Sequence, residues 1–264
     1  MTYYVVQYRD RGPTGLAGTL MRFGRGYGWS AVALFVLAAP YLASTTSAHA
    51  ADARAVEIES VRIGFDDRFK IGSWTPLRVQ VRSTGAEAFE GFLDILVADD
   101  DGAPTRSRWP LRVVAGEGAR VTAYVRTGSR SPDVRFRFVT SDDRVLSETP
   151  LESIRSGTSL PLPLLPDDLI LLSLGRAQGL EELPKLPGIM ATRRGGSREV
   201  AVTRIGGQDA DVLPGRAMGY DGVETVVVDT NDKEMLAALS TRGEALIQWV
   251  ARGGHVVVAV GANW

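Results

Sequence analysis

The side chains best placed for chemistry are an acid that follows one apolar run and a histidine that precedes another. Asp229 comes directly after the apolar residues 226–228, and open α/β sheets bind ligands outside the carboxyl ends of their strands. The same position suits an acid that caps the next helix, a role that residues 230–232 (Thr-Asn-Asp) offer equally, and we favour this role. A catalytic His255 would need a nucleophile and an orienting acid, and its sequence neighbours suggest neither.

Other polar motifs fall short of known sites. The chain has no cysteine, which excludes thiol catalysis, disulfides and thiolate metal sites. Residues 99–102 (Asp-Asp-Asp-Gly) lack the terminal glutamate of a calcium loop and indicate a solvated hairpin tip. Gly206-Gly207 lacks the remaining glycines of a phosphate-binding signature, and the basic loop around Gly195-Gly196 is more typical of a surface connection than of an anion site. We therefore expect no catalytic, cofactor-binding or metal-binding residues and no cofactor, and the sequence identifies no ligand-binding residue.

The net charge of the chain limits the classes of partner that it is expected to bind. The 264 residues carry 30 Lys and Arg against 31 Asp and Glu, a formal charge of -1. A general nucleic-acid binder needs a basic face to offset phosphate charge, so nucleic acid is not an expected partner. The hydrophobic fraction of 44% is ordinary for a folded protein and excludes a disordered chain or a multi-span membrane protein.

Residues 1–50 have the order of an export signal. Arg22 and Arg25 precede an apolar run at 29–42, and small residues lead to Ala48-His-Ala50, which predicts cleavage before Ala51. The apolar core is shorter than the roughly 20 residues of a membrane-spanning helix, although an uncleaved anchor is the alternative. Residues 1–20 fit neither pattern, and one hypothesis is that translation begins at Met21. We expect an exported protein of the periplasm or cell envelope, with membrane anchoring as the alternative.

Residues 51–147 are expected to form an all-β domain. Apolar residues alternate with polar ones from Val56 to about Leu146, with a phase step at Ser60, and glycine-rich or aspartate-rich turns separate the runs. Short strands with this spacing are typical of an Ig-like sandwich. Within it, Trp74 is interpreted as a core or rim residue rather than a sugar platform.

A different pattern follows a proline-rich linker predicted at 148–167. Four near-continuous apolar runs indicate strands buried on both faces of a parallel sheet: 168–174, 199–205, 225–229 and 255–260. Thr241 and Glu244 match a capping box for a helix over 241–252, which places Ala245, Leu246, Trp249 and Val250 on the sheet. Strand, helix and strand in this order predict a right-handed crossover.

Residues 168–264 resemble a class I glutamine amidotransferase-like (flavodoxin-like) domain of bacterial envelope proteins. The resemblance rests on the stretch 219–229 and on Ala245-Leu-Ile-Gln-Trp-Val-Ala-Arg-Gly-Gly-His-Val-Val-Val-Ala-Val-Gly261. In catalytic members a cysteine follows the strand that corresponds to 256–260, where this sequence reads Gly261-Ala-Asn-Trp264. The resemblance therefore implies the fold without the amidotransferase activity, because glutamine hydrolysis in this family needs a thiolate. The sheet stops where the family continues, so we interpret 168–264 as an incomplete, truncated α/β domain.

The sequence as a whole favours a two-domain, non-enzymatic envelope protein that acts as an interaction or scaffold module. Its partners would be envelope proteins that the sequence does not identify. Two alternatives stay open. The first is a hydrolase or ligand-binding enzyme that uses the strand-end crevice near Asp229 and Gly261, and the second is a carbohydrate-binding sandwich with exposed, coplanar Trp74 and Trp109.

Overall fold

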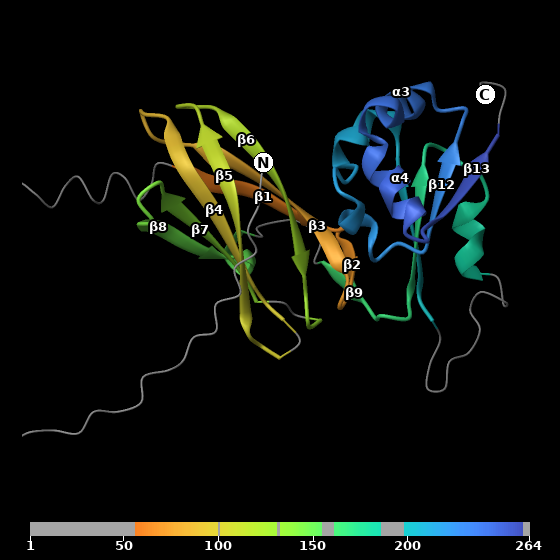
Figure 1. The fold of residues 1–264 in the computed structure, drawn as a ribbon, viewed down its shortest axis with the longest axis horizontal. Helices are drawn as coiled ribbons and strands as arrows, with labels where there is room; N and C mark the ends of the chain where they lie inside the picture. The colour runs from red at the N-terminus through yellow and green to blue at the C-terminus, as the bar shows by residue number, and fades with distance from the viewer. Residues whose placement is uncertain (1–55, 100, 131–132, 155–160, 186–197, 261–264) are drawn as a thin grey trace, which may run out of the picture.

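The computed structural model describes residues 56–99, 101–130, 133–154, 161–185 and 198–260. The described chain is rich in β-strands and has few helices. Residues 56–154, here called the antiparallel region, contain two antiparallel sheets, and residues 161–260, here called the parallel region, contain a four-stranded parallel sheet (Figure 1). The predicted signal or anchor at 1–50 and the basic loop at Gly195-Gly196 lie outside the described residues. In the part of the chain that is described, no helix is long and apolar enough to cross a membrane.

Two antiparallel sheets enclose one core. The first has the strand order β1-β3-β6 and the second β5-β4-β7-β8. Alternate residues of both sheets, together with Leu151, form a single buried cluster, as period-two alternation requires. The expected phase step at Ser60 is confirmed, because the β1–β3 register shifts between Ile58 and Ser60. The strands are β1 Val56–Ile63, β3 Trp74–Ser83, β4 Phe89–Ala98, β5 Pro104–Val113, β6 Gly118–Arg126, β7 Val134–Thr140 and β8 Val145–Pro150.

The stretch 148–167, expected as a linker without periodicity, contains regular structure. Its first residues complete β8, and the short helix α2, Leu151–Ile154, packs Leu151 into the antiparallel core. Strand β9, Leu162–Leu164, then pairs parallel with β2, Arg68–Lys70. The prolines of this stretch suggested a linker. Proline is nevertheless tolerated at strand ends and in edge strands, where its missing N–H is not needed for a ladder hydrogen bond.

The parallel sheet has the strand order β11-β10-β12-β13. One face carries alternate residues that pack into a second buried cluster, and α3 and α4 lie on this face, toward the antiparallel region (Figure 1). The strands are β10 Leu169–Leu174, β11 Val200–Ile205, β12 Thr225–Asp229 and β13 His255–Ala259. The helices are α3 Lys233–Arg242 and α4 Glu244–Ala251.

The predicted capping box of Thr241 and Glu244 is wrong. Thr241 lies inside α3, where its hydroxyl donates to the carbonyl oxygen of Ala238 at 3.0 Å. Gly243 separates α3 from α4 and occupies the N-cap position of α4 without a side chain to bond the backbone. Of the four residues predicted to pack on the sheet, Ala245, Leu246 and Trp249 are buried. The fourth, Val250, is 40% exposed.

The prediction that 255–260 is buried on both faces is also wrong. Among the described strands, β13 lies at the edge of the parallel sheet, with β12 beside it on one side. Val257 is 52% exposed and Val258 is 53% exposed. An apolar run does not distinguish a central strand from an edge strand, because strands in both positions can have the same apolar sequence.

Candidate functional site

The carboxyl ends of the parallel strands hold two acids that bind backbone groups. Asp229 is 6% exposed, and its Oδ1 accepts from the N–H of Asn231 at 3.0 Å. Asp232 is the N-cap of α3, with Oδ1 accepting from Met235 N at 2.9 Å and Oδ2 from Gly207 N at 3.3 Å. The capping role favoured from the sequence is therefore performed at this strand end by Asp232, while Asp229 closes the turn before it.

The strand end near Asp229, where the enzyme alternative placed a crevice, is closely packed at Gly175. Gly175, which follows β10, has a φ of +94°, and a Cβ built there would lie 3.0 Å from the Cβ of Asp232 and 3.1 Å from that of Asp229. Only glycine suits this conformation and this approach. Asp229 and Asp232 therefore pack closely against the backbone at Gly175, while Gly261, the other residue named for a strand-end crevice, lies outside the described residues.

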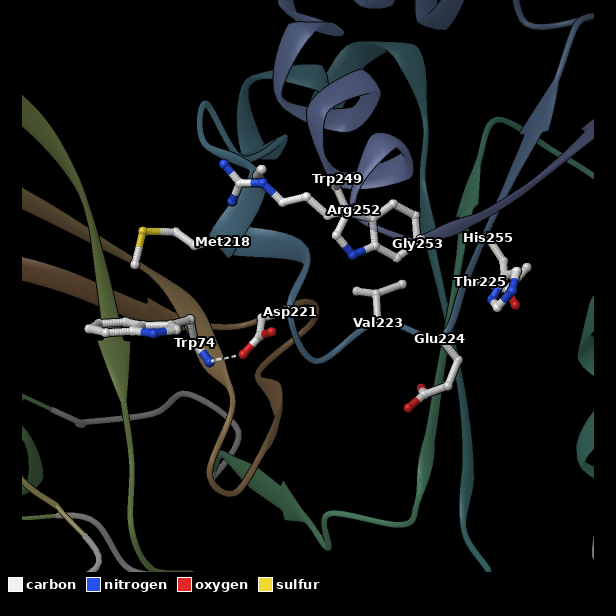
Figure 2. A pocket seen from close by; sticks show the side chains of 12 residues that line it. Trp74, Met218, Asp221, Val223, Glu224, Thr225, Trp249, Arg252, Gly253 and His255 are labelled. Atoms are coloured by element: carbon white, nitrogen blue, oxygen red, sulfur yellow. Dashed lines mark hydrogen bonds between the residues drawn. The ribbon is translucent and has the colours of Figure 1, made fainter.

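A pocket of about 580 Å³ lies instead at the amino ends of β12 and β13 (Figure 2). Trp74 at the start of β3 forms one wall, and the loop before β12 supplies Asp221 and Glu224. Arg252, after the last turn of α4, and His255, at the start of β13, complete its polar lining. The pocket thus lies between the antiparallel and parallel regions, and its volume falls in the usual range for ligand sites.

The acids of this pocket have structural partners. Asp221 Oδ2 accepts from the backbone N–H of Trp74 at 3.0 Å. Glu224 forms an ion pair with Lys70 through one carboxylate oxygen, and its other oxygen accepts from Ile170 N at 2.6 Å. Lys70 is 5% exposed, and burying a charge without such a partner is costly. These acids therefore fix the two regions to each other.

The polar residues singled out from the sequence either bind backbone groups or lie exposed. The described residues contain no cluster of three or more His, Asp or Glu side chains able to hold a metal ion. His255 is exposed at its strand end, and the strand-end acids Asp229 and Asp232 are engaged by backbone N–H groups. Asp99, in the expected hairpin tip, accepts from the N–H groups of Asp101 and Ala103.

The two tryptophans named as a sugar platform have different surroundings. Trp109 is half-buried, its ring centroid lies 6.3 Å from that of Tyr124, and the Arg216 guanidinium lies 5.5 Å from its ring centre. Trp74 is half-buried at the rim of the pocket. Desolvation raises the pKa of Tyr124, which accepts hydrogen bonds from backbone N–H groups at Gly215 and Arg216. Trp109, Tyr124 and Arg216 therefore form part of the contact between the two regions.

Sequence reasoning did not identify the residues that join the two regions. Arg78 on β3 donates to the carbonyl oxygens of Val212 at 3.2 Å and Gly64 at 3.0 Å, and burial lowers the pKa of its guanidinium. Arg120 on β6 forms an ion pair with Asp211. Such partners are about 90 to 150 positions apart in the sequence, so no local pattern relates them.

Exposed apolar side chains are concentrated on α4, on β13 and at the residue that follows β13. We call this set the β13 surface, and its members are 40–65% exposed: Ile247, Val250, Val257, Val258 and Val260. These residues make up most of the large apolar side chains that are exposed in the described chain. Exposed apolar side chains gathered in one part of a protein are a common feature of interaction sites.

Comparison with known proteins gives limited matches. A family model described as a domain of unknown function (DUF8726) matches residues 56–152, which span the antiparallel region from β1 into α2. No curated protein matches this chain.

Solved structures resemble only part of the chain. The alkylpurine DNA glycosylase AlkC of Pseudomonas fluorescens has 13% identity and a TM-score of 0.25, over 36% of this chain and 29% of that protein. A β-glucosidase from Listeria innocua in complex with glucose has 13% identity and a TM-score of 0.23, over 36% of this chain and 15% of the enzyme. The C-terminal domain of wzt has 14% identity and a TM-score of 0.27, over 37% of this chain and 66% of that domain. This chain thus spans less than a third of the glycosylase and of the glucosidase, and at these scores the likeness carries no argument about function.

Proposed function

We propose that this chain is a non-catalytic interaction module of the cell envelope, built from an Ig-like sandwich and an amidotransferase-like α/β layer. Two antiparallel sheets of three and four strands around one core support the Ig-like assignment. The parallel order β11-β10-β12-β13 corresponds to the first four strands of a flavodoxin-like sheet and supports the second assignment.

The β13 surface is the single observation that carries the interaction role. Val257 and Val258 expose more than half of their side chains on a strand whose sequence, His-Val-Val-Val-Ala, contains no acid, lysine or arginine. Water contact of such residues is unfavourable, and a partner that covers them gains the hydrophobic free energy.

The carboxylates support a non-catalytic role. A hydrolase needs an acid or base able to exchange a proton with substrate. Asp229, Asp232 and Glu224 each accept hydrogen bonds from backbone N–H groups, which position them as structural groups. The chain has no cysteine to serve as the thiol nucleophile of an amidotransferase.

Export is the second part of the proposal. It is supported by the basic, apolar and small-residue order of residues 1–50. Envelope proteins are the partners that this location offers.

Site-specific photo-crosslinking tests the proposal in cells that produce the full chain. Val258 is replaced by p-benzoylphenylalanine, and the same replacement at Val145, 51% exposed on β8, is the matched control. We expect crosslinked adducts from position 258 in the envelope fraction, and none from position 145. The absence of an adduct at 258, or recovery of the intact precursor from the cytosol, would overturn it.

A further inference from the structure

The pocket between the two regions is lined by a half-buried aromatic ring and by two charged side chains of opposite sign. Part of the Trp74 indole can be contacted from the pocket, because this residue is half-buried and lines it. Met218, on the short helix η3 (Ala217–Tyr220), lies beside the ring, and Arg252 extends from the end of α4 toward the same wall (Figure 2). Asp221 lies next to Trp74 and accepts from its backbone N–H. All of these residues precede β13 in the sequence.

Close packing fixes the walls of the pocket before a ligand enters. A Cβ built on Gly254 would lie 2.3 Å from Cδ2 of Trp249, so the turn after α4 packs directly on that indole. Trp249 is buried, and its ring centroid lies 5.7 Å from that of Tyr220. A Cβ built on Gly222 would lie 3.3 Å from the Cβ of Lys70, which holds the loop before β12 against the antiparallel region. Fixed walls favour affinity, because little conformational entropy is lost when a ligand binds.

The charges that line the pocket balance. Glu224 is paired with Lys70, which neutralises its carboxylate. With His255 neutral, the exposed Asp221 and Arg252 then contribute one negative and one positive charge. A strongly anionic or cationic ligand would be attracted by one of these groups and repelled by the other. An uncharged ligand that both donates and accepts hydrogen bonds suits both, because a carboxylate only accepts and a guanidinium only donates.

We propose that this pocket binds an uncharged saccharide of one or two hexose rings. One sugar ring lies on the indole of Trp74, whose flat apolar surface matches the C–H groups on the face of a pyranose. Asp221 accepts from a sugar hydroxyl through Oδ1, and Arg252 donates to hydroxyl or ring oxygens. The pocket volume of about 580 Å³ suits a ligand of this size. The inference goes beyond the proposed function, because the pocket shares no residue with the β13 surface.

This site differs from the sugar platform that the sequence suggested. Trp109 is not among the residues that line the pocket, and its ring lies near those of Tyr124 and the Arg216 guanidinium instead. The saccharide contacts Trp74 from the antiparallel region and Asp221 from the parallel region. Because the folded state alone has this arrangement, a bound saccharide should also raise the thermal midpoint of unfolding.

Saturation-transfer NMR on the full chain tests the proposal, because this method detects the weak binding expected of a single aromatic platform. The probes are maltose, cellobiose and N,N′-diacetylchitobiose, each titrated into the millimolar range, and leucine is the zwitterionic comparison. We expect saturable transfer to the ring protons of at least one disaccharide. Saturable transfer to none of the three would overturn the proposal, and binding of leucine alone would assign the pocket to zwitterions instead.

Variants establish whether a saccharide binds at this pocket. Trp74→Ala should weaken binding by about tenfold, because the stacking surface is lost. Arg252→Ala should weaken binding several-fold, and this exposed position is expected to tolerate the change even if Trp74→Ala does not fold. Arg112→Ala, which removes an exposed arginine of β5, is the matched control and should bind like the wild type. Unchanged affinity in Arg252→Ala, or in a folded Trp74→Ala, would overturn the proposal.

Discussion

Phe65 of the antiparallel region stacks on Tyr220 of the parallel region, with ring centroids 6.3 Å apart and an interplanar angle of 26°. Phe65 follows β1 in a tight hairpin whose two central residues, Asp66 and Asp67, both have positive φ. Tyr220 is fully buried, and desolvation raises the pKa of its hydroxyl. Phe65 thus belongs to the core of the parallel region although its hairpin starts from the antiparallel sheet, so we expect the two regions to unfold together.

Replacement of Phe65 by alanine tests this coupling. We expect the free energy of unfolding to fall by about 3–5 kcal/mol, because a buried aromatic ring is lost and a cavity remains. We also expect the single denaturation transition to separate into two, measured by fluorescence and circular dichroism. Phe92→Ala is the control, since Phe92 is half-buried under the Arg108 guanidinium and outside the contact. A single transition for Phe65→Ala at the wild-type midpoint would contradict the coupling.

The Lys70–Glu224 ion pair gives a second prediction. Glu224→Gln should lower the free energy of unfolding by roughly 3 kcal/mol, because the buried ammonium group of Lys70 loses its counter-charge. The double variant Lys70→Met, Glu224→Gln should recover much of that loss, since no unpaired charge is then buried. Urea denaturation measures both. A double variant less stable than Glu224→Gln would show that the pair contributes more than its burial costs.

The start of α3 gives a third prediction. Asp232→Ala removes the side chain that accepts from Met235 N and Gly207 N, and should cost roughly 1–2 kcal/mol in thermal or urea denaturation. Thr241→Ala should stay within about 0.5 kcal/mol of the wild type, because Thr241 lies exposed inside the helix. A larger loss of stability in Thr241→Ala than in Asp232→Ala would instead support the capping box that the sequence suggested.

Acid sensitivity gives a fourth prediction. A hydrogen bond from Arg137 lowers the pKa of Glu148 below its ordinary value. A carboxyl with a lowered folded pKa stabilises the protein above its unfolded pKa, and this contribution is lost as pH falls through the folded pKa. Stability should therefore fall with acidification from about pH 4.5 downward. Glu148→Gln and Arg137→Gln should each flatten the slope, measured by urea denaturation at several pH values. An unchanged slope in both would contradict this assignment.

Glutamine hydrolysis gives a fifth prediction. The purified chain should release no ammonia from glutamine above the buffer rate, because no thiol follows β13 or occurs elsewhere. An enzyme-coupled ammonia assay measures it. A rate proportional to protein concentration that Asp229→Asn abolishes would instead support the hydrolase alternative.

Strand positions could largely be predicted from the sequence because burial has a local signature there. Alternation around Val79 and Val121 and the phase step at Ser60 correspond to observed strands and to the observed register shift. The bounds of helix α3 were not predicted because its apolar residues follow one another at 235–239 instead of recurring at helical spacing, and only Met235 is fully buried. The edge position of β13 depends on the number of neighbouring strands, which no local pattern contains.

The candidate sites were harder to predict because they arise from contacts between distant segments. Trp74 and Asp221 are 147 positions apart, yet a backbone hydrogen bond joins them at the pocket. Asp229 was singled out correctly as a strand-end acid, but the backbone around Asn231 determines that it closes a turn. The sequence thus indicated which side chains could act chemically. The tertiary contacts that determine the role of each side chain could not be predicted from it.

Amide hydrogen exchange of β13 tests the central claim, that the β13 surface binds a partner of the cell envelope. The exchange of residues 255–259 is measured on the full chain alone and after addition of detergent-solubilised envelope proteins, with the edge strand β8 as the internal reference. We predict that the added proteins slow the exchange of β13 and leave that of β8 unchanged. Exchange of β13 that is equally fast with and without them would contradict the claim.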